Sequence, residues 1–272
     1  MTETTTPRIP RWRLISFWVL LVLLLVLHLG ERPEQLGFIV TAFAGLPEGA
    51  GATHEIHMFA QGVLAWIILA AVLVQLRRPA SQVGAAWVYG IGSVLAFGMF
   101  LLLADLPPGA APVVGGAIVI AGLAFVAHPS PWRVRVTSVA RPSRALLALT
   151  AVSAVPLIVY AAGQLSIHAG SGAHDEHHAF GHWIVMAAYT LLVVLFAAVA
   201  AWRVWGWRFP LWAASLMAAA LGVGSLAITA VSQLSTAWAV LAIVWAVAFV
   251  GLGEYEARRD AVVTPRIPVG RS

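Results

Sequence analysis

Residues 174–202 read HDEHHAFGHWIVMAAYTLLVVLFAAVAAW, a polar and histidine-rich head followed by about twenty apolar residues. An apolar run of this length is long enough to cross the hydrocarbon core of a bilayer as one α-helix. Similar runs recur along the whole chain, which is 61% hydrophobic and only 10% charged. The sequence therefore predicts an all-α, polytopic membrane protein with the lipid bilayer as its main partner, and not a soluble enzyme with a large core.

The apolar runs predict about eight transmembrane helices. The first run follows a short basic tail and lacks a small-residue cleavage site, so we expect it to be retained and not removed as a signal peptide. The eight predicted spans are residues 12–29, 57–76, 84–104, 111–127, 145–165, 179–202, 210–230 and 236–253.

The basic residues predict the orientation. All sixteen are arginine, and with a cytoplasmic N-terminus every one except Arg32 falls in an inner segment. The positive-inside rule gives this distribution when the number of spans is even and both termini are cytoplasmic. We therefore expect a multi-pass protein of the inner (plasma) membrane. The pI of about 10.7 then reflects topology, and nucleic acid is not an expected partner.

The same orientation places eight of the nine histidines at the outer face, and only His128 at the inner face. Ionisable groups at a membrane are rare and tend to be functional, so this concentration points to metal, haem or proton chemistry. The absence of cysteine excludes thiolate metal sites, iron–sulfur clusters and covalent c-type haem. The outer histidines are His28, His54, His57, His168, His174, His177, His178 and His182.

Other polar side chains also fall toward the outer ends of their helices, whereas the inner halves are almost wholly Ala, Val, Leu and Ile. This pattern favours an outward-open site confined to one leaflet over a path through the membrane. The outer polar residues are Tyr160, Gln164, Ser225, Thr229, Ser232 and Gln233.

The spacing of the second histidine group suits metal binding. His174, His178 and His182 are spaced i, i+4, i+8, so one continuous helix would carry all three on one face. Imidazoles at this spacing can chelate Zn²⁺, Cu²⁺ or Fe, and His57 or Glu55 would supply a further ligand from another helix. The predicted metal ligands are His54, His57, His174, His178 and His182.

The chain also shows signs of an internal duplication. Residues 55–59 (EIHMF) and 176–180 (EHHAF) share Glu, His and Phe at the same spacing, and paired glycines recur in later helices. We therefore expect two tandem four-helix repeats, residues 1–135 and 136–272, related by an axis along the membrane normal.

This duplication would place His57 and His178 at equivalent points, at the outer ends of the second and sixth helices. His182 stands where the first repeat has Gln61, so the repeats differ at the site. One composite centre between the halves is easier to reconcile with this difference than two identical centres. The predicted cofactor-binding residues are His57, His178 and His182, within reach of a quinone or a periplasmic redox partner.

Tandem four-helix bundles with Glu and His near the outer start of the second and sixth helices resemble the haem A synthase family and, more distantly, b-type membrane cytochromes. The resemblance implies haem b bound through histidines, with a catalytic glutamate in each half. It would assign His57 with Glu55 to the first half, and His178 or His177 with Glu176 to the second. The chain departs from the family because its fourth and eighth helices carry no outer histidine.

Three functions remain open on the sequence alone. The first is a protein that binds b-type haem for redox or haem-related chemistry. The second is a membrane metalloenzyme or metal-handling protein that binds Zn, Cu or Fe. The third is a non-catalytic membrane subunit whose histidines take up protons near neutral pH.

Overall fold

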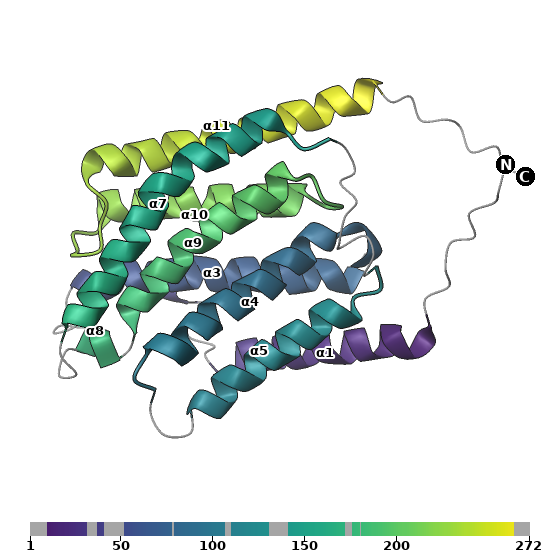
Figure 1. The fold of residues 1–272 in the computed structure, drawn as a ribbon, viewed down its shortest axis with the longest axis horizontal. Helices are drawn as coiled ribbons and strands as arrows, with labels where there is room; N and C mark the ends of the chain where they lie inside the picture. Colours follow the sequence, from purple (N-terminus) through teal and green to yellow (C-terminus); the bar gives the residue numbers. More distant parts are fainter. Residues whose placement is uncertain are drawn as a thin grey trace, which may run out of the picture.

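The computed structural model describes residues 10–31, 37–40, 52–77, 79–106, 110–130, 141–171, 176–179 and 181–263 (Figure 1). Across these ranges the chain is built from α-helices with one short 3₁₀ turn, and it forms no β-strand. Seven of the described helices are long and apolar enough to cross a membrane. The predicted all-α class is thus confirmed, and the helices indicate a multi-pass membrane protein.

The observed helices match the predicted spans closely, but three are longer: α3 begins five residues earlier, and α7 and α11 end five and ten residues later. The last helix runs ten residues beyond its predicted end, because its charged residues find partners: Glu254 accepts hydrogen bonds from Arg208 and Trp212. The helices are α1 (Arg11–Glu31), α3 (Ala52–Arg77), α4 (Val83–Leu103), α5 (Ala110–Ala127), α7 (Arg144–Gly170), α8 (Glu176–Ala179), α9 (His182–Ala201), α10 (Arg208–Ala227) and α11 (Thr236–Val263).

Four helices form the centre of the bundle. Helices α3, α4, α9 and α10 pack against one another, while α1 and α5 lie at one side and α7 and α11 at the other (Figure 1). About two-thirds of α3 and α9 is buried inside the protein, against 17% of α5. The side helices expose large apolar residues such as Val126 and Val152, which is the surface expected in contact with lipid.

The packing is arranged in matching pairs. Helix α3 packs on α10 and α4 packs on α9, while α1 pairs with α5 and α7 pairs with α11. A twofold axis that relates the first-half helices α1, α3, α4 and α5 to the second-half helices α7, α9, α10 and α11 would produce these pairs. The duplication itself stays a prediction.

The predicted helix over residues 179–202 is interrupted at its start. Gly181 has φ of 62° and separates the short helix α8 from α9. Only glycine adopts this left-handed conformation without strain, and a Cβ here would also lie 2.9 Å from the ring of Phe100. The expectation of one continuous helix carrying His178 and His182 on one face is therefore wrong.

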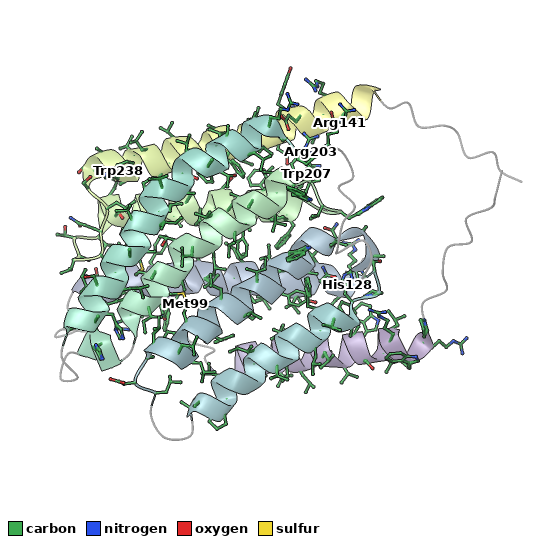
Figure 2. The ribbon with its side chains drawn as sticks, in the orientation of Figure 1. Met99, His128, Arg141, Arg203, Trp207 and Trp238 are labelled. Atoms are coloured by element: carbon green, nitrogen blue, oxygen red, sulfur yellow. The ribbon has the colours of Figure 1, made fainter. Side chains whose placement is uncertain are left out.

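The two ends of the bundle differ in chemistry. One end, which we call the arginine end, carries Arg141, Arg203, Trp207 and His128 (Figure 2). Arg203 is 6% exposed and bonds to Glu256 and, at 2.6 Å, to Asp260 on α11. This ion-pair network joins the end of α9 to the end of α11.

His128 is a structural residue of the arginine end. Its Nδ1 accepts a hydrogen bond from the Ser130 backbone at 3.1 Å, so Nε2 carries the proton and donates to Gln75 at 3.2 Å. Burial lowers the pKa of His128 to about 4. The side chain is thus neutral near pH 7. Its two hydrogen bonds connect the segment after α5 to Gln75 on α3.

Candidate metal centre

Three histidines converge at the end of the bundle opposite the arginine end. His57 lies in the second turn of α3, His177 lies on α8, and His182 is the first residue of α9. One nitrogen from each ring lies within 4.8 Å of the other two. Their ring centroids are 5.0 to 5.9 Å apart. We call these three residues the histidine triad.

The triad is shielded from solvent. His57 is fully buried and His182 is 8% exposed, while His177 is partly buried. The indole of Trp183, itself 3% exposed, packs on His57 at 5.1 Å and on His177 at 5.4 Å. The ring nitrogens of the triad are therefore held in a water-poor site, where electrostatic and metal–ligand interactions are strong.

A hydrogen-bond chain orients His57. Ser232, in the connection between α10 and α11, donates from Oγ to the Gln164 side-chain oxygen at 2.8 Å. The same Oγ lies 2.8 Å from His57 Nε2, so it accepts the proton that Nε2 carries. Tyr160 in turn donates to the Ser232 carbonyl. This arrangement fixes the orientation and tautomer of the His57 ring, as partners of metal-binding histidines do.

His178 belongs to a second group. Its ring stacks on His168 with centroids 4.1 Å apart. Its Nδ1 faces the His168 carbonyl at 3.0 Å and the Ser171 hydroxyl at 3.1 Å, while Nε2 faces the Asp105 carboxylate at 3.1 Å. Both nitrogens thus have partners outside the triad, and His178 is not grouped with the triad among the residues that the structure describes. Its role as a metal or cofactor ligand stays a prediction.

The remaining predicted residues have different outcomes. Glu55 lies on α3 with a partly exposed side chain, and it is not among the residues grouped with the triad. His54 and Glu176 lie on α3 and α8, but their side chains fall outside the described part of the structure, as does the whole of His174. The triad therefore keeps two of the predicted ligands, His57 and His182.

For the third member, His177, the sequence predicts a role only as an alternative to His178 in binding haem in the second half. A glycine inside a predicted helix signals a possible break, and Gly181 is that signal here. The break changes the direction of the chain between α8 and α9, so residues four apart no longer share a face. The sequence predicts His168 at the outer face. No spacing pattern predicts that its ring stacks on His178.

The donor set of the triad suits a transition metal ion. Asp105 follows α4 and contacts His178. Three neutral imidazoles suit Zn²⁺, Cu²⁺ and other first-row ions, and three protein ligands leave one coordination position open. The arrangement can therefore hold an ion that also binds a further molecule.

Comparison of the chain with protein-family models, with curated proteins and with solved structures finds no match. The resemblance to the haem A synthase family accordingly stays a prediction.

The first prediction separates the triad from His178. We expect His57→Ala and His177→Ala to weaken Zn²⁺ or Co²⁺ binding by more than about 100-fold, because losing a ligand costs more than losing a residue that orients one. The matched variant His178→Ala should bind like the wild type. Metal titration of purified, metal-stripped protein measures the three affinities, and equal losses in all three would contradict the assignment.

The second prediction concerns the hydrogen-bond chain. Ser232→Ala removes the acceptor for His57 Nε2 and releases the ring tautomer, so we expect metal affinity to fall by about 10- to 100-fold. Ser171→Ala is the control, because Ser171 serves the His168–His178 group instead. The same titration compares them. Unchanged affinity in Ser232→Ala would show that the chain does not orient a ligand.

Proposed function

We propose that this protein is a multi-pass membrane protein that binds one first-row transition metal ion through His57, His177 and His182. The observation that carries the proposal is the convergence of three imidazoles, two of them buried and one partly buried, with one nitrogen of each within 4.8 Å of the others. Two of these residues come from the second half of the chain and one from the first. The ion would join the two halves.

The donor set decides which ions fit. Imidazole nitrogens suit Cu²⁺, Zn²⁺, Ni²⁺ and Fe²⁺, and affinity in such sites usually rises toward Cu²⁺. When bound, the ion would supply an open position for a substrate, either as a Lewis acid or as a redox centre. The protein's part is to orient His57 through Ser232 and Gln164, and to shield His57 and His177 with Trp183.

Haem b is less well supported by the same geometry. An iron bound between His57 and His182 would need the flat macrocycle to extend sideways between the two rings. His177 lies 5.9 Å and 5.5 Å from them, on one of those sides, and Trp183 packs 5.1 Å from His57. These rings occupy the space into which the macrocycle would extend. Haem therefore stays a prediction, as do the catalytic roles of Glu55 and Glu176.

The proton-responsive alternative would use a different group. His178 and Asp105 form the contact suited to it, with 3.1 Å between Nε2 and Oδ2. Asp105 is 74% exposed, so such a pair contributes little to stability. This observation supports the alternative more weakly than the buried triad supports metal binding.

The proposal includes the orientation of the site. We infer eight spans, with α1 as the first, two repeats over residues 1–135 and 136–272, and both termini in the cytoplasm of an inner-membrane protein. The arginines gathered at one end of the bundle support this orientation through the positive-inside rule. The triad would then face the extracytoplasmic side.

The third prediction tests the proposed function. We expect detergent-purified protein to contain one transition metal ion per chain by elemental analysis, and to show no Soret band. Metal-stripped His57→Ala,His182→Ala protein, checked for an intact fold by circular dichroism, should fail to reload. A Soret band that disappears in this variant would support haem instead, and absence of both haem and metal binding would leave the proton-responsive subunit.

The fourth prediction tests the orientation. The chain has no cysteine, so single-cysteine variants can be labelled without background. A membrane-impermeant maleimide added to intact cells should label Asp105→Cys and spare Arg77→Cys, and disruption of the cells should expose both. The reverse pattern would place the triad on the cytoplasmic side.

A further inference from the structure

An apolar cavity of about 250 Å³ lies in the bundle close to the triad. It is lined by residues from α1, α3, α4, α5 and α9 and is partly open, and nearly all of its lining side chains are aliphatic or aromatic. Cavities of this kind stay dry and bind apolar molecules when these are present. In a membrane protein such molecules are supplied by the bilayer.

The cavity begins directly beneath the triad. Gln61, which lines it, lies one helical turn after His57 on α3, and Val185 lies three residues after His182 on α9. Phe100 also lines it and packs against Gly181, where a Cβ would lie 2.9 Å from its ring. A ligand in the cavity would therefore contact the residues that hold the triad in place.

Two polar side chains line the otherwise apolar walls. Ser93 is 1% exposed, and its Oγ makes no hydrogen bond with the residues that the structure describes. Ser93 follows Gly92, which packs near Ile68, seven residues or about 10 Å beyond Gln61 on α3. The two polar groups thus lie at different depths of the cavity. Both a serine hydroxyl and a glutamine amide can donate a hydrogen bond to a carbonyl oxygen.

The walls between these polar groups suit a flat ring with an apolar tail. Phe97 and Phe100 supply aromatic faces from α4, and aromatic rings favour stacked or edge contacts with other rings. Val113 of α5 lines the cavity and is 41% exposed. Since α5 itself is mostly exposed, an apolar tail would leave the cavity past this residue.

We propose that this cavity binds the head of a membrane quinone, with one carbonyl oxygen near Gln61 and the other near Ser93. A quinone carries two acceptor oxygens at opposite ends of one rigid ring, which matches polar groups at two depths of an apolar space. A single-chain lipid has one polar end and would leave Ser93 without a partner. A buried hydroxyl without a partner destabilises the protein, and a hydrogen bond to a quinone oxygen would remove that penalty. The proposal does not depend on metal at the triad.

The test uses the full chain in lipid nanodiscs and decylubiquinone as the probe, with empty nanodiscs subtracted. We expect saturable binding of one quinone per chain. Ser93→Ala and Gln61→Leu should each weaken binding by about five- to tenfold, the effect of one hydrogen bond. Ala96→Phe should abolish binding because it fills the cavity.

Ser215→Ala is the matched control, because Ser215 is 4% exposed with no described partner at Oγ but does not line the cavity. It should bind quinone like the wild type, and His57→Ala should bind quinone after losing metal. Non-saturable binding would overturn the proposal. So would equal affinities in Ser93→Ala, Gln61→Leu and Ser215→Ala, or displacement of the quinone by laurate at equal concentration.

Discussion

The left-handed turn at Gly181 is the constraint on which the site depends. It ends α8, begins α9 and is held from the side by the ring of Phe100 on α4. Without it, α8 and α9 would continue as one helix, and His177 and His182 could not both reach His57. Glycine is the residue that adopts this conformation at least cost, so a single position without a side chain decides which histidines meet.

The second constraint is the hydrogen-bond chain from α7 through Ser232 to His57. It joins the first half of the chain to the second through a buried serine, 0% exposed, with 2.8 Å on each side. The opposite end of the bundle uses charge for a similar purpose, since Arg203 bonds to Glu256 and Asp260. The protein thus uses an ion-pair network at one end and a hydrogen-bond chain to His57 at the other.

The fold class and most helix positions follow from the sequence because the length of an apolar run is a direct measure of what crosses a bilayer. The location of most histidines at one end follows from the same predicted spans, because these residues lie near helix ends that share one face. The choice between His177 and His178 does not, because it depends on the break at Gly181 and not on the helical period. The sequence predicts Ser232, Gln164 and Tyr160 only as polar residues near the outer face. Their hydrogen-bond chain to His57 has no periodic pattern, because it connects residues far apart in the sequence. The duplication, the haem resemblance and the residues outside the described ranges stay predictions.

The central claim is that three imidazoles share one ion. X-ray absorption at the metal edge of the loaded wild-type protein tests it most directly. We expect three histidine nitrogens at about 2.0–2.1 Å from the ion, as in zinc sites, with one further light ligand in the open position. A first shell with a single histidine, or four equal nitrogens with the scattering pattern of a porphyrin, would contradict it.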